Sequence, residues 1–292
     1  MEKLISKEIS AKDAGRRLGD YLKTEMELTK AQIRRLKYQE NALRVNGCQE
    51  RVTCLLKEGD LLEVLIKNSR DAEEKLVPVE GDLDILYEDE DVICIWKPAG
   101  IVVHPVGCHK EDSISNYLTA YFRKKNEMVQ IRSIGRLDKD TSGVLVFAKN
   151  RIAAARLWAQ KEQGIFQKEY LAVCEGSFAP EEYETEQTID MPIGKCRDYP
   201  GKMCIDPDGK RAVTHYLAIK GGKVRLRLET GRTHQIRVHM EWAGHPLAGD
   251  PLYGNGVRGK TQTALCAYKA EFLQPFSHDR IQVTEDRLKE QL

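Results

Sequence analysis

The stretch that decides the fold is GRLDKDTSGVLVFAK, residues 135–149, in which a polar turn runs directly into a group of apolar residues. The four apolar residues 144–147 predict a buried strand, and Gly143 marks the turn before it. Because residues two apart in an extended segment point to the same side, Arg136 and Asp138 can face one cleft together. A structural Arg–Asp pair on a surface turn is the alternative, and this stretch alone does not choose between them.

The composition indicates a globular protein with two domains. The chain has 292 residues, of which 41% are hydrophobic and 31% are charged, and a chain of this length usually folds as more than one domain. No apolar run approaches the ~20 residues that span a bilayer, and the N-terminus lacks the apolar core of a signal peptide. We therefore expect a cytoplasmic monomer that does not associate with membranes.

The eight cysteines show no Cys-x-x-Cys spacing. Several lie within apolar runs that are typical of strands, namely Cys94, Cys174 and Cys266. This pattern favours reduced, buried thiols over a zinc site or a disulfide framework.

Charge is distributed unevenly, although the net charge is only +1. Residues 1–70 hold 15 Lys and Arg against 11 Asp and Glu, and residues 197–260 hold 12 against 6. Between these regions, residues 71–92 hold one Lys against ten acidic residues. Two basic regions separated by an acidic linker are compatible with faces that attract a polyanion, and ordinary solvated charge is the alternative.

The first basic region predicts a small unit of helices and strands. Apolar residues within 18–22 have helical spacing, and Thr29 with Gln32 predicts the capping box of a second helix. Strands are expected at 43–45, entering an Asn-Gly turn, and at 61–66. Steps of four and three residues place three cations of the second helix on one side, here called the basic stripe: Lys30, Arg34 and Lys37.

Downstream of a polar, charged linker, the pattern predicts strands at 83–87 and 92–96. Asn150 is expected to cap a helix whose apolar side carries Ile152, Ala155, Leu157 and Trp158. In a strand at 168–173, alternation places Tyr170 on one face with Lys168 and Ala172.

A last helix is predicted to begin at the cap Thr233 and to end at Gly244. Its N-terminal amides, together with Arg232, make an end that favours anions. His234 and His239 are five residues apart and do not share a helix face, so the pattern does not favour a metal site.

Two parts of the chain resemble known families. Residues 12–66 resemble the α-L RNA-binding module of a small-subunit ribosomal protein, through Arg-Leu-x-x-Tyr-Leu, Thr-Lys-x-x-Ile-Arg-x-Leu, Val-Asn-Gly and Gly-Asp. Residues 84–275 resemble the RluA-type pseudouridine synthases through these motifs: Lys-Pro-x-Gly-x-x-x-His-Pro from 97, Arg-Leu-Asp-x-x-Thr-Ser-Gly from 136, Lys-x-Tyr-Leu-Ala from 168, Thr-Gly-Arg-Thr-His-Gln-Ile-Arg-Val-His from 230 and Gly-His-Pro-Leu-Ala-Gly-Asp-Pro-Leu-Tyr-Gly from 244. Gly135 departs from that pattern, in which a His usually precedes the Arg.

The resemblance implies an α+β fold in which a small N-terminal α-L RNA-binding module precedes a catalytic domain. That domain would have the mixed, largely antiparallel sheet of the pseudouridine synthase fold. We place the module at 12–67, an acidic linker at 68–82 and the catalytic domain at 83–292. The implied activity is that of an RNA-modifying isomerase that converts a uridine of structured RNA to pseudouridine. The module favours ribosomal RNA, of the large subunit, over transfer RNA, and hence a role in rRNA processing.

The resemblance also implies roles for individual residues. Asp138 is the catalytic aspartate, Tyr170 lies against the target base, and Arg237 is the arginine paired with the aspartate. A nearby guanidinium keeps a carboxylate charged where desolvation alone would raise its pKa. Arg136 is suited to fill the gap in the RNA stack when the target nucleotide flips out, and Arg232 to bind substrate. The basic stripe is expected to contact phosphates.

Isomerisation of uridine breaks the bond between uracil and ribose, turns the base, and rejoins it through carbon 5. Since no electrons are transferred and no group leaves, we expect no cofactor and no metal. A structural role is expected for His104, whereas Lys97 is left open between lining the site and binding loop backbone. The alternatives are a non-catalytic RNA-binding or ribosome-assembly factor on the same fold, and a nucleoside hydrolase with Asp140 as its second carboxylate.

Overall fold

The first part of the chain forms a four-stranded antiparallel sheet in the order β1-β4-β2-β3. The computed structural model describes residues 2–67, 76–183, 185–257 and 262–285. The strands are β1 (Glu2–Glu8), β2 (Leu43–Val45), β3 (Cys48–Gln49) and β4 (Leu61–Lys67). This part of the chain also has one 3₁₀ turn, η1 (Ala11–Asp13), and two helices, α1 (Leu18–Thr24) and α2 (Lys30–Lys37). Both helices contribute side chains to an apolar cluster that they share with the sheet.

The predicted capping box is present at the start of α2. The side chain of Thr29 accepts a hydrogen bond from the backbone N–H of Gln32 (3.2 Å), and the Gln32 side chain accepts one from the N–H of Thr29 (2.7 Å). Strand β1 was not predicted, because Leu4 and Ile5 are adjacent and give no alternation. It pairs with β4 over its whole length, so the N-terminal module is defined here as residues 2–67.

The rest of the chain, the C-terminal lobe, is built on a ten-stranded and largely antiparallel sheet, which confirms the predicted mixed α+β class. Its main path is β10-β13-β14-β9-β15-β8-β6-β5, with β16 on β15 and β7 on β8. The strands are β5 (Asp84–Glu88), β6 (Val92–Lys97), β7 (Arg132–Ser133), β8 (Ser142–Ala148), β9 (Gln167–Val173), β10 (Gln187–Asp190), β13 (Val213–Ile219), β14 (Lys223–Leu228), β15 (Leu265–Leu273) and β16 (Arg280–Thr284). A separate hairpin and four helical segments complete the lobe: β11 (Ile193–Lys195), β12 (Met203–Ile205), α3 (Ile114–Lys124), α4 (Arg151–Glu162), η3 (Pro180–Glu182) and α5 (Gln235–Trp242).

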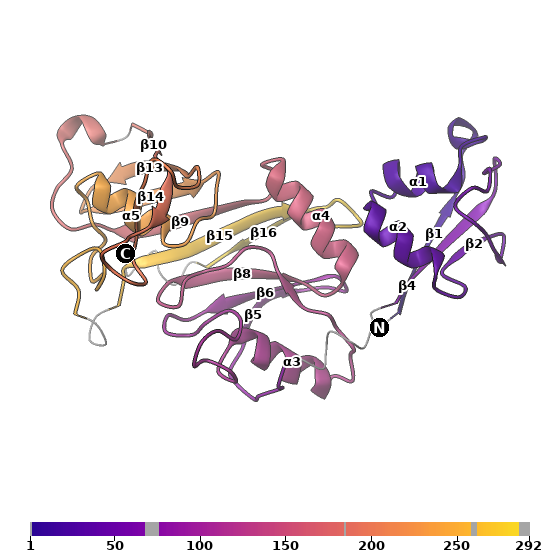
Figure 1. The fold of residues 1–292 in the computed structure, drawn as a ribbon, viewed down its shortest axis with the longest axis horizontal. Helices are drawn as coiled ribbons and strands as arrows, with labels where there is room; N and C mark the ends of the chain where they lie inside the picture. The colour runs from indigo at the N-terminus through magenta and orange to yellow at the C-terminus, as the bar shows by residue number, and fades with distance from the viewer. Residues whose placement is uncertain (1, 68–75, 184, 258–261, 286–292) are drawn as a thin grey trace.

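Strand β8 separates two apolar layers. Leu145 and Phe147 pack in the cluster that includes α3, whereas Val144 and Val146 pack in the cluster that includes α4. Figure 1 shows α3 and α4 on opposite sides of this sheet. Because side chains alternate along a strand, the four-residue apolar run at 144–147 is buried on both faces, as a continuous run predicts.

Strands β8 and β15 form a parallel pair at the point where the polar turn enters the sheet, with Gly143 opposite Ala267. Gly143 has φ of 130°, and a Cβ atom at this position would collide with the backbone of Ala267. Glycine is therefore required here, and it fixes where β8 begins relative to the loop that precedes it.

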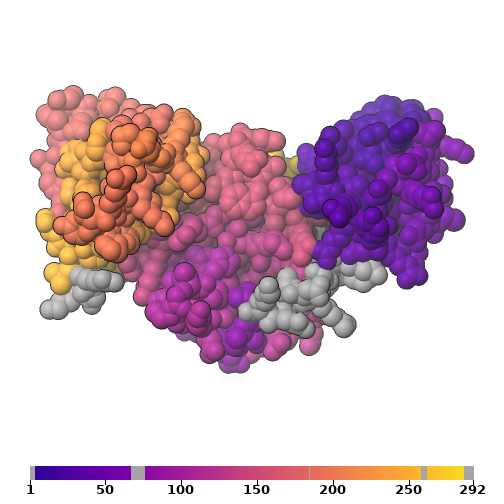
Figure 2. All heavy atoms as spheres, viewed as in Figure 1, coloured from indigo at the N-terminus to yellow at the C-terminus, as the bar shows by residue number. Residues whose placement is uncertain are grey.

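Helix α4 joins the N-terminal module to the C-terminal lobe. The Arg156 guanidinium donates hydrogen bonds to the backbone carbonyls of Met26 (2.6 Å) and Pro275 (2.7 Å). Ile152, in the first turn of α4, is buried in the apolar cluster of the module. Figure 2 shows the module, in indigo, as a separate lobe beside the rest of the molecule.

Helix α4 starts as predicted, but its buried face differs from the prediction. The Asn150 side chain accepts hydrogen bonds from the N–H groups of Ile152 (3.0 Å) and Ala153 (2.8 Å). Leu157 is buried, whereas Trp158, which was predicted on the apolar side, is 41% exposed. Since adjacent helical residues point about 100° apart, Trp158 turns away from the layer that buries Leu157.

The cysteines are free, and the three predicted as buried thiols are buried: Cys94, Cys174 and Cys266. In the described ranges, no helix has the length and apolar character needed to cross a membrane.

Candidate active site

Asp138 lies on a loop that ends directly in β8. Its carbonyl oxygen accepts a hydrogen bond from the N–H of Thr141 (3.2 Å), which closes the turn before the strand. The Asp138 side chain is half-buried, whereas its neighbour Leu137 is buried in an apolar cluster that also contains Tyr170 and Ile236. The three motifs that carry Asp138, Tyr170 and Arg237 therefore meet at one apolar cluster.

A buried lysine ties the Asp138 loop to the loop after β6. Lys97 is fully buried, and its ammonium donates hydrogen bonds of 2.8–2.9 Å to three backbone carbonyls, those of Pro98, Ile101 and Lys139. Burial lowers the pKa of Lys97 to about 8, and the charges of Asp140 and Asp138 oppose this change. Of the two interpretations left open for Lys97, the structure shows the one in which it binds loop backbone.

Tyr170 reaches the site from β9. Tyr170 and Ala172 are buried in the same cluster, and the ammonium of Lys168 donates a hydrogen bond to the carbonyl of Val144 (2.9 Å). Burial, followed by the charge of Asp138, raises the pKa of the Tyr170 phenol. The phenol is therefore neutral at physiological pH, so its ring can stack on a base but the side chain is not a phenolate.

Arg237 forms its salt bridge with Asp250. Its Nε and Nη2 atoms donate hydrogen bonds of 2.6 Å to the two carboxylate oxygens of Asp250, and both side chains are at most 3% exposed. Burial would lower the pKa of Arg237, but the hydrogen bond and charge of Asp250, with the charge of Asp138, raise it. Asp250 also accepts hydrogen bonds from the N–H groups of Leu252 (2.9 Å) and Tyr253 (3.2 Å).

This geometry corrects the pairing that was expected for Arg237. Among the residues that the structure describes, no salt bridge joins Arg237 to Asp138, and Asp138 acts on Arg237 as a neighbouring charge. The physical reason is that Asp250 offers both carboxylate oxygens to the planar guanidinium in a fully buried position, which is the geometry that an arginine prefers.

Helix α5 begins one residue later than predicted, because its cap is His234 and not Thr233. His234 has a left-handed backbone conformation, with φ of 56°, and serves as the N-cap residue. Its Nδ1 atom lies 2.9 Å from the hydroxyl of Tyr253, and the Arg237 guanidinium lies 4.9 Å from the centre of the Tyr253 ring. Burial lowers the pKa of His234, which also feels four neighbouring charged groups: Asp138, Arg237, Asp250 and Arg136. The three motifs that carry these groups, which begin at residues 136, 230 and 244, are therefore adjacent.

Two other histidines of the motifs are engaged with protein groups through both ring nitrogens. His239 lies 2.9 Å from the Thr214 hydroxyl and 3.0 Å from the carbonyl oxygen of Met191. His104 lies 2.7 and 2.8 Å from two serine hydroxyls, those of Ser115 and Ser133. These contacts agree with the structural role expected for His104.

The remaining predicted site residues lie on the surface. Arg136 and Arg232 are exposed, and the Nε atom of Arg232 donates a hydrogen bond to the carbonyl of Arg211 (2.9 Å). The basic stripe is exposed on α2 of the N-terminal module, apart from the buried cluster around Arg237. The structure thus brings Asp138, Tyr170 and Arg237 together and leaves the other predicted residues around them or on the module.

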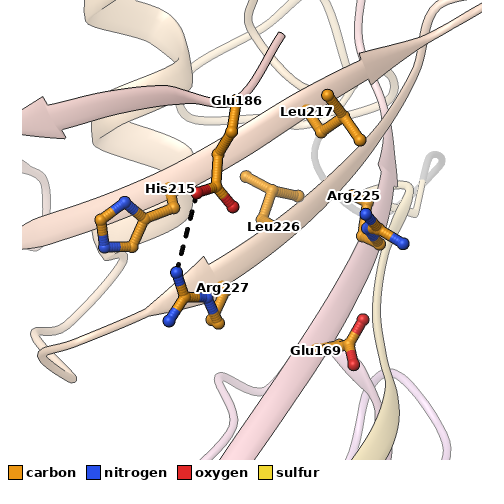
Figure 3. Close-up of a pocket in the computed structure, with 7 residues that line it drawn as sticks. All are labelled: Glu169, Glu186, His215, Leu217, Arg225, Leu226 and Arg227. Atoms are coloured by element: carbon orange, nitrogen blue, oxygen red, sulfur yellow. Dashed lines mark ion pairs between the residues drawn. The ribbon is translucent and has the colours of Figure 1, made fainter. Parts of the chain in front are cut away.

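A polar hollow of about 230 Å³ occupies a different place on the sheet. Figure 3 shows its lining, in which Glu186 and Arg227 form an ion pair of 3.8 Å. Glu169 lines this hollow, whereas Tyr170, the next residue of β9, points to the opposite face of the strand. The hollow is therefore separate from the site that contains Asp138.

Asp250 and Tyr253 were not predicted as site residues, although the Gly-His-Pro run that contains them was recognised as a motif. Their role depends on contact with Arg237, on a separate helix, and no local pattern specifies such a contact. The sequence signal that could have indicated these two site residues was an acidic and an aromatic residue close together in a loop-forming motif.

Comparisons with known proteins show the family to which this chain is similar. The RNA pseudouridylate synthase family matches residues 91–242. The chain is 36% identical over 280 residues to the uncharacterized RNA pseudouridine synthase YhcT of Bacillus subtilis, covering 94% of this chain and 90% of that protein. It is 40% identical over 200 residues to ribosomal large subunit pseudouridine synthase D of Escherichia coli, covering 67% and 60%. The structure of human RNA pseudouridylate synthase domain containing 1 matches with a TM-score of 0.56 at 26% identity, covering 71% and 84%.

The chain therefore belongs to the RNA pseudouridine synthases, and the RluA type predicted from its motifs is confirmed. It is an isomerase that modifies RNA, rather than the non-catalytic factor or the hydrolase that the sequence left as alternatives.

Proposed function

We propose that this protein converts a uridine of large-subunit ribosomal RNA to pseudouridine. Two relatives whose names specify the large ribosomal subunit support the target: the Escherichia coli enzyme, and synthase D of Yersinia pestis at 37% identity over 75% of this chain. The observation that carries the reaction is that the charge of Asp138 acts on both Tyr170 and Arg237. The motifs of these residues meet in one apolar cluster through Leu137, Tyr170 and Ile236.

Asp138 is the acting carboxylate of this proposal. It is half-buried on a loop that Lys97 and β8 hold in place, so it can reach a nucleotide without moving its backbone. In the reaction, the bond between N1 of uracil and C1′ of ribose breaks and a bond between C5 and C1′ forms. The proton on C5 is lost and N1 gains one, so that substrate and product have the same mass.

Tyr170 and Arg237 act around Asp138. The neutral Tyr170 ring stacks on the flipped uracil and keeps it in place while it turns. Arg237, fixed by Asp250, supplies a positive charge close to Asp138, whose own charge contributes to raising the pKa of Arg237. Arg237 thus acts on the carboxylate through space, while its own hydrogen bonds are used to hold its position.

The exposed cations bind the RNA. Arg136, two residues before Asp138, occupies the gap left in the RNA stack, and Arg232 binds a phosphate near the target nucleotide. The basic stripe of the N-terminal module contacts phosphates farther along the RNA and supplies affinity that does not depend on sequence.

Asp138→Asn tests the reaction. The substitution keeps the size of the side chain and removes its charge, so we expect pseudouridine formation to fall by at least about a thousandfold while RNA binding is retained. Asp140→Asn on the same loop is the matched control, and we expect it to remain active. Mapping pseudouridines in large-subunit RNA that was incubated with each purified protein measures both, and retained activity of Asp138→Asn would contradict the assignment.

The target is tested separately by mapping pseudouridines in total RNA from cells with and without the gene. We expect one or more large-subunit positions to lose the modification. A loss confined to transfer RNA would contradict the ribosomal target and leave the reaction unaffected.

A further inference from the structure

The surface of α4 carries an aromatic ring and a lysine that the predicted site did not include. Trp158 is 41% exposed, and the ammonium of Lys161 lies 5.0 Å from the centre of its ring. We call these two residues the α4 ridge. An exposed tryptophan with a cation over its face is a surface on which a planar, electron-rich group can stack.

Lys161 extends from this ridge toward the Asp138 loop. A Cβ atom on Gly135 would lie 2.9 Å from its Nζ atom, and a Cβ atom on Gly231 would lie 3.8 Å from it. The ammonium therefore lies between the loop that leads to Asp138 and the loop that leads to α5. Gly135 itself has φ of 80°, a left-handed backbone conformation that favours glycine.

Lys161 has no counter-charge among the residues that the structure describes. In the part of the chain that the structure describes, the ammonium of Lys161 forms no hydrogen bond and no ion pair, and it contacts the Trp158 ring. Burial lowers the pKa of Lys161, and its charge in turn contributes to lowering the pKa of Lys168. A half-buried cation without a counter-charge is poised to bind an anionic group.

On its other side, the ridge borders a hollow of about 600 Å³ between α2 and α4, here called the α2–α4 hollow. Trp158 lines it together with three arginines, and its lining contains no Asp or Glu: Arg35, Arg132 and Arg151. The Nε atom of Arg132 is buried and has no hydrogen-bond partner among the described residues. Figure 2 shows the surface of this part of the C-terminal lobe beside the indigo module.

These features form a continuous basic path. The α2–α4 hollow begins on α2, whose neighbouring face carries the basic stripe, and it reaches Trp158 on α4. Lys161, one turn later, reaches the loop of Asp138. An aromatic side chain set along a positively charged groove is the combination by which proteins hold single-stranded nucleic acid.

We propose that the α2–α4 hollow and the α4 ridge hold a single-stranded segment of the substrate RNA next to the target uridine. Trp158 stacks on one base of this segment, and Lys161 binds the phosphate between that base and the flipped uridine. The RNA is single-stranded there because only an unpaired base can leave its stack and lie on an aromatic ring. The choice of RNA as ligand rests on the proposed function.

The experiment measures binding of the full-length protein to a short oligouridylate at several salt concentrations. Trp158→Ala is expected to weaken binding by about tenfold, because it removes a stacking partner. Lys161→Gln is expected to lower the slope of log affinity against log salt by about 0.7, which corresponds to one phosphate contact on a single strand. Both side chains are at the surface or unpaired, so neither substitution is expected to unfold the protein, and the thermal midpoint checks this.

Two variants serve as controls. Trp158→Phe keeps an aromatic face and is expected to bind nearly as well as the parent protein. Lys124→Gln removes an exposed lysine that forms an ion pair with Glu80. This lysine belongs to α3, which lies on the opposite side of the sheet from α4, so the substitution is expected to leave the salt slope unchanged.

Parent protein that does not bind oligouridylate, or affinities and slopes that are unchanged in Trp158→Ala and Lys161→Gln, would overturn the proposal. Pseudouridine formation in large-subunit RNA is measured on the same preparations. Normal isomerisation together with unchanged binding by both variants would reject the path and leave the proposed function intact. If the parent protein does not isomerise uridine but its RNA binding depends on Trp158, the proposed function is rejected and the proposed RNA path is retained.

Discussion

Arg237 is 3% exposed and bound to Asp250 through two hydrogen bonds, whereas the cations of the basic stripe are exposed on α2. All carry the same charge, but their surroundings differ. A buried and paired guanidinium has a fixed position, so it can set the electrostatics around Asp138 before any substrate arrives. Exposed cations remain available for phosphates that the protein itself does not supply. Lys161 lies between these extremes, since it is half-buried but unpaired in the described residues.

Asp250→Ala is expected to have the largest effect, because it turns the buried pair into a buried, unpaired charge. We expect a loss of about 3–5 kcal/mol in the free energy of unfolding. If the protein still folds, misplacement of Arg237 is expected to lower isomerisation by about a hundredfold. Urea unfolding and a pseudouridine assay measure the two effects.

The control for this prediction is the double variant Arg237→Met, Asp250→Leu. Because it removes both charges together, most of the stability is expected to return while activity stays low. Wild-type activity in Asp250→Ala would contradict the view that Asp250 positions Arg237.

Lys97→Met tests a second buried cation, one that binds carbonyl oxygens in place of a carboxylate. Loss of its hydrogen bonds is expected to lower the free energy of unfolding by about 2 kcal/mol at pH 7. Since burial lowers the pKa of Lys97 to about 8 from the ordinary lysine value of 10.5, the unfolded chain binds more protons between these values. The contribution of Lys97 to stability therefore rises with pH through this window, at a slope of at most about 1.4 kcal/mol per pH unit.

Urea unfolding at several pH values between 7 and 10 measures this effect. The difference in stability between the parent protein and Lys97→Met is expected to grow as the pH rises. A difference that is constant with pH would contradict a lowered pKa for Lys97 in the folded protein.

Charge reversal on the basic stripe, Arg34→Glu with Lys37→Glu, is expected to have the smallest effect on stability, because both side chains are exposed. RNA binding is expected to weaken, and the slope of log affinity against log salt to fall by about 1.5. Filter binding over a salt series measures the slope, and Lys124→Glu on α3 is the control. An unchanged slope in the double variant would show that the module does not contact RNA.

Several elements could be predicted because their causes are local. The strand after Gly143 follows from an apolar run, and the Thr29 capping box follows from short-range hydrogen bonds. The shared face of Tyr170 and Ala172 follows from strand alternation. Strand β1 was missed because its apolar residues do not alternate. The exposure of Trp158 was missed because Leu157 and Trp158 were both assigned to the apolar side, although adjacent helical residues point about 100° apart.

By itself, the sequence determined the family, the mixed α+β class and the order of the motifs, because these depend on residue types at fixed spacings. It also indicated that Asp138, Tyr170 and Arg237 belong to one site. The tertiary structure alone decided what holds them: Arg237 is bound by Asp250, 13 residues away, and Lys97 binds the carbonyl of Lys139, 42 residues away. Such partners are chosen by proximity after folding, when a buried charge is stable only beside groups that satisfy it.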